Sequence, residues 1–250
     1  MGKFLCEMTY EECKKEIGPD TIIVIPSGGG TKEHGYHLPM GTDMYVTEYV
    51  AAKVTKRSNC ITLPIVSYAY YPAFITWAGS VSLDYNTSIK VMEDIITCYI
   101  RFGVKKFLIL DGGVSTQAPM RILSSEMYNK YGVRVAVSSV VGLGAEAESA
   151  VCKQKMGGHG DEGETSCMLY IHPELVHMEK AVEEYQIPMP GMRKNGIQKI
   201  AMSGKMDTPH GINGNATLAT AEKGKVILDA MVDGVVEFLE NFQKLEVIEK

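Results

Sequence analysis

The chain has 250 residues, of which 22% are charged and 45% hydrophobic, with a formal net charge of -5. This length allows a large buried core and lies at the upper edge of one domain, so we expect a single domain over residues 1–250. The acidic balance, without a basic stripe, argues against nucleic-acid and membrane partners, and we expect a small-molecule substrate.

The cysteines and the N-terminal segment indicate the compartment. Six cysteines are scattered without a C-x-x-C pair, which is typical of reduced thiols rather than of a disulfide framework. The N-terminal segment carries acids and lysines where a signal peptide needs an apolar run, and no apolar stretch reaches about 18 residues. The sequence therefore predicts a cytoplasmic protein.

The first half of the chain alternates helical and extended patterns. A short helix is expected over residues 10–17 and a buried strand, TIIVIP, over 21–26. A helix from about 43 to 57 and a strand over 60–68 follow. Apolar residues at helical spacing then predict a helix over 89–99 that ends before Gly103.

The second half continues this alternation. We expect strands over 107–113, 133–141 and 199–204, and a long helix from Asn215, its N-cap, to about Gln243. Strands that alternate with helices predict an α/β fold with a largely parallel sheet covered by helices on both faces.

A glycine-rich stretch after the first buried strand, residues 25–43, carries the side chains of a metal site together with one that opposes a metal. Four side chains are of types that bind metals: Glu33, His34, His37 and Asp43. Lys32 lies among them, and its ammonium repels a divalent cation. The stretch is therefore an intact metal site, a lost one, or a site that uses the lysine instead.

Two more polar clusters follow strands. Asp111 opens DGGVST, and GGHGDEGETS spans residues 157–166. Ligands of such sheets bind outside the carboxyl ends of the strands, where all three clusters fall, so we expect one active site there. The alternative for each cluster is structural: a plain glycine turn, a satisfied histidine or a solvated acidic loop.

Two signatures resemble those of the creatininase family of amidohydrolases. Residues 34–43 follow the second half of P-x-G-S-x-E-x-H-G-x-H-L-P-x-x-T-D, and residues 159–166 match H-A-G-E-x-E-T-S. Residues 79–80, 211–215 and 219–224 add further similarity in the same order. The resemblance implies a three-layer α/β fold, a hexamer built from dimers, and two zinc or manganese ions that hydrolyse a cyclic amide or a formamide.

The metal positions depart from that pattern. Lys32 stands where the family has a glutamate ligand, while Gly113 and Ser115 replace a histidine and a glutamate of the middle signature. Only His34 and Asp43 remain as inherited ligands, too few for the usual three-ligand zinc site. Glu33 and Asp111 are the candidates to complete it. We expect at most one zinc or manganese ion per chain, or none.

Lys32 has three possible roles. Its ammonium can replace part of the charge of a lost cation and polarise a substrate oxygen. A desolvated amine with a lowered pKa could form a Schiff base with a ketone. The third alternative is a lysine that points into water.

The late signature supplies the acid/base chemistry. We assign His159 as general acid/base and Glu164 as the residue that orients it or binds substrate. The structural alternative is loop architecture, with Thr165 and Ser166 capping the next helix. Substrate binding is assigned to three residues: His37, Ser115 and Glu162.

The resulting hypothesis is a hydrolase that acts on a C–N bond of a small cyclic amide or related polar metabolite, with a degenerate metal site. One alternative is hydrolytic ring opening of a keto-sugar or cyclitol, for which Lys32 is suited. Another is a non-catalytic metabolite-binding subunit, although such a protein has no need of His159 and Glu164.

Overall fold

The computed structural model describes residues 1–186 and 208–247, so the strand predicted over 199–204 lies outside the described residues. A five-stranded, wholly parallel sheet forms the centre, with the strand order β1-β3-β2-β4-β5. The strands are β1 Lys3–Phe4, β2 Ile22–Ser27, β3 Ile61–Thr62, β4 Lys106–Asp111 and β5 Arg134–Ser139.

The strand sequences are apolar at consecutive positions because both faces of the sheet are buried. Ile22 and Val24 on β2 belong to one core cluster, whereas Ile23 and Ile25 belong to the other. Successive side chains of a strand point to opposite faces, so a continuous apolar run supplies both cores at once.

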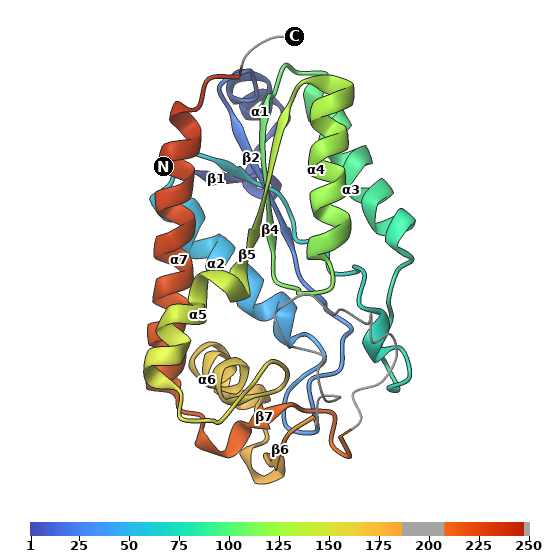
Figure 1. Ribbon diagram of the computed structural model, residues 1–250. Helices are drawn as coiled ribbons and strands as arrows, with labels where there is room; N and C mark the ends of the chain where they lie inside the picture. The colour runs from blue at the N-terminus through green and yellow to red at the C-terminus, as the bar shows by residue number, and fades with distance from the viewer. Residues whose placement is uncertain (187–207, 248–250) are drawn as a thin grey trace, which may run out of the picture.

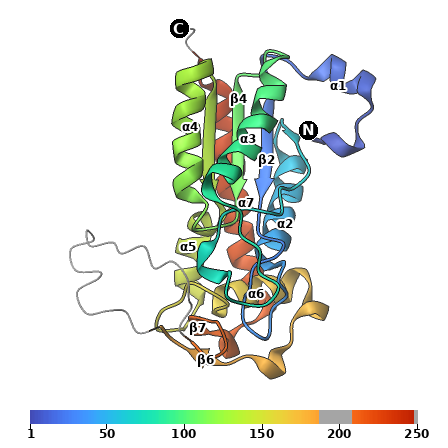
Figure 2. The ribbon, with the colours of Figure 1, turned by 90° about the vertical axis from the view of Figure 1, so that its right-hand side faces the viewer.

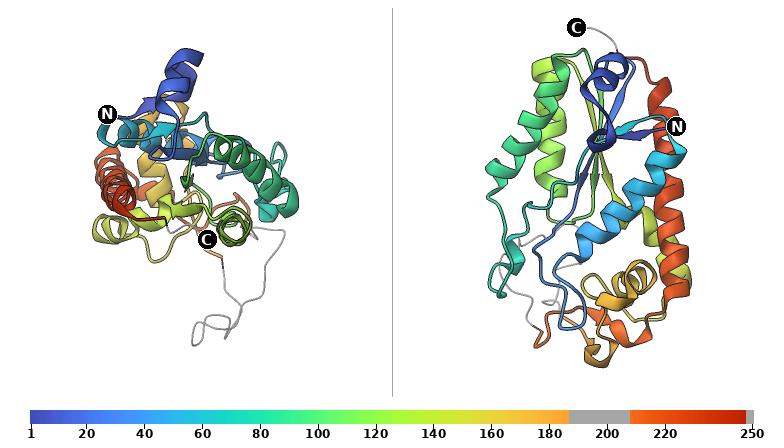
Figure 3. Two further views of the ribbon diagram at one scale, coloured as in Figure 1. Left: turned by 90° about the horizontal axis from the view of Figure 1, so that it is seen from above. Right: turned by 180° about the vertical axis from the view of Figure 1, so that it is seen from behind.

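Helices cover both faces of the sheet (Figures 1 and 3). On one face lie α2 Thr42–Arg57, α5 Val140–Val151 and α7 Ala221–Lys244, and α6 Glu162–Ile171 packs against α2 and α7 beyond the carboxyl ends of the strands. On the other lie α3 Tyr85–Ile100 and α4 Gln117–Tyr131. The predicted three-layer α/β architecture is confirmed. No helix in the described part of the chain has the length and apolarity needed to cross a bilayer.

The two ends of the sheet differ. The short helix α1, Tyr10–Glu16, stands away from the layers at the end where the strands begin (Figure 2). At the other end, the loops that follow β2 and β4 meet α6 and a small two-stranded antiparallel sheet of β6 Glu183–Glu184 and β7 Gly214–Asn215 (Figure 1). This is the end where the polar clusters were expected.

Two predicted elements have different bounds. The strand over 60–68 is reduced to β3, because Pro64 has no N–H to continue the ladder and the chain then follows β2 only through isolated bonds such as Val66 N to Pro26 O, 2.9 Å. The last helix begins at Ala221, with Thr220 as its N-cap, while Asn215 caps the short 3-10 turn before it.

Candidate active site

A cavity of about 270 Å³ lies where the predicted clusters meet. Its wall combines residues of all three: Lys32 and Asp43 from the first, Gly112 to Thr116 from the second, and His159 and Glu164 from the third. The carboxyl ends of β2 and β4 are adjacent in the sheet, which brings the first two loops together. The prediction that the clusters converge is confirmed.

Lys32, Asp43 and His34 form a buried chain of contacts. The Lys32 ammonium donates to Asp43 Oδ2 at 2.7 Å, and His34 Nε2 lies 2.9 Å from Asp43 Oδ1. The other ring nitrogen of His34 lies 2.9 Å from the Lys32 carbonyl oxygen. Lys32 is 8% exposed and Asp43 5% exposed, so the lysine does not point into water.

Charge pairing keeps both partners ionised. Burial lowers the pKa of the Lys32 ammonium, but attraction to Asp43 and Glu164 outweighs burial and leaves that pKa raised. Burial likewise opposes ionisation of Asp43, but Lys32 and His34 hold the pKa of its carboxyl below the usual range. A raised pKa favours the protonated ammonium, so the site supports Lys32 as a positive charge rather than as a Schiff-base amine.

His159 is buried beside this pair. Its Nε2 lies 3.2 Å from Glu33 Oε2, and its ring packs 4.4 Å from that of Phe74 and 4.7 Å from that of His34, centroid to centroid. Burial, and then the charges of His34 and Lys32, lower its pKa well below the ordinary value. His159 is thus a neutral imidazole with a carboxyl group at one nitrogen, the arrangement of an oriented base.

Glu33, a candidate metal ligand by sequence, faces inward. Its carboxyl contacts His159 and also accepts from the Gly35 backbone N–H. Burial raises the pKa of Glu33 to about 7, against the opposing effect of the Gly35 N–H. Glu33 therefore contacts His159, and it does not belong to the group of side chains that could hold a metal ion in the described part of the chain.

Asp111, predicted as a metal ligand, organises its own loop instead. Thr116 Oγ1 donates to both of its oxygens, at 2.7 and 2.6 Å, Gln117 Nε2 donates at 2.6 Å, and the Gly113 N–H donates at 3.1 Å. Burial raises the pKa of the Asp111 carboxyl to about 6 despite these donors. Asp111 does not line the cavity and does not belong to the group of side chains that could hold a metal ion in the described part of the chain.

Two of the residues assigned to substrate binding have structural contacts instead. His37 Nε2 lies 2.8 Å from Thr165 Oγ1, and burial lowers the pKa of this imidazole to about 4. Glu162 is completely buried and accepts from Lys153 N, Gln154 N and Lys223 Nζ, which joins α6 to α7. Neither residue lines the cavity, whereas Ser115 does.

The N-terminus of α6 also differs from the structural alternative. Asp161, not Thr165 or Ser166, is the N-cap, and it accepts from Glu164 N at 3.0 Å. Thr165 and Ser166 lie inside the helix. This cap places Glu164 in the first turn, where its carboxylate accepts from Gly160 N at 2.6 Å and burial raises its pKa.

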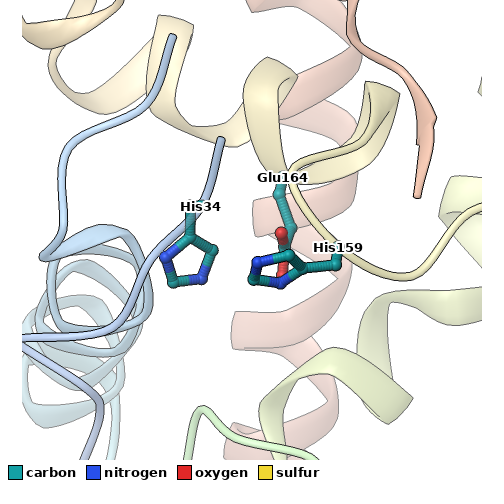
Figure 4. A group of neighbouring side chains, drawn as sticks. All are labelled: His34, His159 and Glu164. Carbon is teal, nitrogen blue, oxygen red and sulfur yellow. The ribbon is translucent and has the colours of Figure 1, made fainter. Parts of the chain in front are cut away.

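His34, His159 and Glu164 form a group that could hold a metal ion. One ligand atom of each lies within 4.8 Å of the others, and the three side chains point toward one another (Figure 4). Two imidazoles and a carboxylate are the donor set of a three-ligand catalytic zinc site. Lys32 occupies Asp43 Oδ2, and Gly113 and Ser115 place no carboxylate or imidazole on that side of the cavity.

The cavity wall includes residues outside the three clusters. Tyr70, Tyr71 and Phe74 come from the loop between β3 and α3, and Phe74 lies 5.1 Å from the Lys32 ammonium. Glu148 comes from α5. The aromatic residues between Tyr68 and Trp77 in the sequence could have indicated the three aromatic wall residues. No sequence pattern indicated that Glu148 would line the cavity.

Comparisons with known proteins agree with the geometry. A family model, Creatininase (creatinine amidohydrolase), matches residues 6–239. The 3-dehydro-scyllo-inosose hydrolase of Thermotoga maritima is 26% identical over 93% of this chain and 81% of its own length. The mycofactocin precursor peptide peptidase of Mycobacterium tuberculosis is 30% identical, with 86% and 82% covered. The creatinine amidohydrolase of Pseudomonas putida is 22% identical, with 94% and 95% covered.

Solved structures show the same fold. A crystal structure of creatinine amidohydrolase (creatininase) superposes with a TM-score of 0.82 at 23% identity, covering 97% of this chain and 98% of that one. A structure named Creatininase Mn and a Zn-Zn type creatininase variant have TM-scores of 0.79 and 0.77, each at 22% identity, and cover 97% and 96% of this chain and 99% and 98% of their own. Since the family model spans most of the sequence and the fold agrees, the chain belongs to the creatininase family and is a hydrolase.

Proposed function

We propose that this hydrolase cleaves a C–N bond of a small cyclic amide or a related polar metabolite, with at most one divalent ion per chain. The observation that carries the proposal is the buried Lys32–Asp43 pair, 2.7 Å long, in the wall of the cavity that His159 also lines. A fixed positive charge stands where the family resemblance places a metal ligand, and a neutral imidazole stands beside it.

The residues can divide the reaction between them. Lys32 polarises the amide carbonyl and stabilises the negative charge that develops on its oxygen. His159, oriented by Glu33, takes a proton from the attacking water, so that a C–O bond forms. As the C–N bond breaks, the imidazolium returns that proton to the leaving nitrogen. The products are a carboxylic acid and an amine within one opened ring.

A metal ion, if bound, would be held by His34, His159 and Glu164. His34 would then give up its contact with Asp43 Oδ1 or with the Lys32 carbonyl oxygen. Metal binding by His159 is an alternative to its acid/base role, because the imidazole has one nitrogen besides the one that faces Glu33. Its chemistry would be that of a Lewis acid that polarises the carbonyl oxygen or activates water. Relatives of this fold include structures named for manganese and zinc, which supports those two ions as candidates. The Lys32 ammonium repels any such ion, which favours loose binding.

Ring opening of a ketone-bearing cyclitol is the second candidate function. Its support is the similarity to the 3-dehydro-scyllo-inosose hydrolase and the fixed charge of Lys32, which can polarise a ketone as well as an amide. Because the pKa of Lys32 is raised, this route uses the ammonium as an electrostatic group and not as a Schiff-base amine.

The test is a hydrolysis screen with the purified protein. The panel holds cyclic amides, formamides, a keto-cyclitol and short peptides, each assayed with EDTA and with added zinc or manganese. Release of a new amine from a cyclic amide supports the proposal. Turnover of the keto-cyclitol alone would replace it with the second candidate, and cleavage of peptides alone would refute both.

We further propose a cytoplasmic homo-oligomer, a hexamer as the family resemblance implies. All six cysteine thiols are free, which suits a reducing compartment, and large apolar side chains such as Ile75 and Val114 are 58% and 70% exposed on this single chain. Light scattering is expected to give about six times the chain mass of 27.4 kDa. A stable monomer at micromolar concentration would contradict this prediction.

Metal content provides a separate prediction. Protein purified without chelator and then reloaded with zinc or manganese is expected to retain at most one ion per chain, and to lose it readily to EDTA.

Lys32→Glu restores the ligand type of the family and removes the opposing charge, so it should raise metal affinity while lowering native activity. Metal content is measured by elemental analysis of the wild type and of Lys32→Glu. Two tightly held ions per wild-type chain would contradict the proposal of at most one ion.

A further inference from the structure

We propose that Glu148 recognises a positively charged nitrogen group on the substrate and so determines which substrates enter the cavity. The inference rests on the proposed use of this cavity as the active site, but it does not depend on which bond is cleaved there. Glu148 belongs to none of the three polar clusters and reaches the cavity from α5.

Glu148 differs from the other carboxylates of the cavity wall in having no partner. Asp43 is bound by Lys32 and His34, and Asp161 accepts from Gly158 N, Gln154 Nε2 and Glu164 N. Glu164 accepts from Gly160 N. Within residues 1–186 and 208–247, the half-buried Glu148 carboxylate has neither a hydrogen bond nor an ion pair.

The charge balance of the wall favours a cation. Lys32 compensates Asp43, while Glu148, Asp161 and Glu164 remain as three further acids around the same cavity. Burial, followed by repulsion from Asp161 and Glu164, raises the pKa of Glu148 to about 7. A ligand cation next to Glu148 would relieve both effects, because it supplies the missing partner and offsets the repulsion.

A glycine in α6 leaves room for the carboxyl group of Glu148. A Cβ atom added to Gly163 would come within 2.7 Å of both Cδ and Oε1 of Glu148, so the carboxyl group occupies the space that the glycine leaves. Residue 163 is glycine, which has no side chain to fill this space. Gly163 thereby fixes where the Glu148 carboxylate lies along the cavity wall.

The chemistry points to an ammonium or amidinium group. A carboxylate binds planar nitrogen cations through paired charge-assisted hydrogen bonds. The aromatic rings of Tyr70, Tyr71 and Phe74 line the same cavity, and such rings attract cations and stack on planar ones. A substrate of this kind would place its cation near Glu148 and its carbonyl near Lys32, because the two residues have opposite charges.

Guanidinium and urea provide a probe pair of the same shape but different charge. Binding of each, at millimolar concentration and low ionic strength, is measured by NMR titration for wild type, Glu148→Gln, Gly163→Ala and Glu146→Gln. Glu146 is an exposed acid on the same helix, so its variant removes the same charge outside the cavity. Melting curves establish that each variant is folded.

Wild type is expected to bind guanidinium at least about 10-fold more tightly than urea, since a hydrogen bond to a charged partner is worth that factor or more. Glu148→Gln should abolish the preference, Gly163→Ala should weaken it by displacing the carboxylate, and Glu146→Gln should keep it within about twofold. Equal binding of guanidinium by wild type and Glu148→Gln, or no preference over urea in wild type, overturns the inference.

The outcome is separable from that of the proposed function. A preference that depends on Glu148, together with no hydrolysis of cyclic amides, refutes the proposed function and leaves the inference intact. Hydrolysis of cyclic amides with unchanged guanidinium binding in Glu148→Gln does the reverse. With a substrate in hand, Glu148→Gln should raise KM for a cationic substrate and leave KM for a neutral analogue nearly unchanged.

Discussion

Lys32→Met is expected to reduce turnover of the substrate found in the screen by about 10²- to 10³-fold, the usual effect of removing one group that stabilises a developing oxyanion. Methionine keeps much of the volume of lysine but carries no charge. The carbonyl oxygen of the substrate then loses its positively charged neighbour. The methionine side chain can still pack against the Phe74 ring, which the Lys32 ammonium contacts in the wild type. The measurement is kcat per folded protein, with the folded fraction taken from circular dichroism.

The same variant should lower stability. Removal of Lys32 leaves the buried Asp43 carboxylate with His34 as its remaining side-chain partner, and breaking a buried ion pair costs about 3–5 kcal/mol of unfolding free energy. Arg57→Met is the control, because the Arg57–Asp233 pair has the same 2.7 Å length but is exposed and is worth at most about 1 kcal/mol. Equal urea midpoints for the two variants, or wild-type turnover in Lys32→Met, would show that the Lys32 charge does not act in the site.

His159→Ala should reduce turnover by about 10²-fold or more, the effect of a positioned acid/base. The buried ring contacts Phe74 and His34 and its Nε2 faces Glu33, so alanine removes both the proton acceptor and its packing. Stability should fall only modestly, because His159 lies in a loop at the end of the sheet and belongs to neither main core cluster.

His37→Ala is the matched control for His159. His37 is equally buried but contacts Thr165 and does not line the cavity, so its loss should lower stability and leave kcat within a few-fold of wild type. Addition of imidazole should partly restore the activity of His159→Ala and not that of His37→Ala. Wild-type turnover in His159→Ala would remove this residue from the mechanism.

Local sequence determined the strands and the broad architecture. The run from Ile22 to Ile25 is apolar at every position, and only a strand buried on both faces uses all of these side chains at once. The sequence motif also indicated that His34 and Asp43 lie close together. They are nine positions apart, on one loop and on the helix turn that follows it. The sequence therefore sufficed for the fold, the family and the location of the site.

Tertiary structure decided the helix ends, where several residues could have served. Asn215 and Thr220 are both good N-caps by sequence. Asn215 pairs with Glu183 in the small two-stranded sheet, which keeps it outside the helix, and Thr220 takes the capping role. The choice depends on a partner 32 positions away, which no local pattern contains.

The roles of the site residues likewise depended on distant contacts. Lys32 could have pointed into water, and only burial against Asp43 fixes it as a charged pair. Glu33 meets His159 across 126 positions, and Glu148 reaches the cavity because Gly163 of another helix leaves it room. Sequence patterns specify which residue types are available, whereas the packing of separate segments decides which way each side chain points and what it touches.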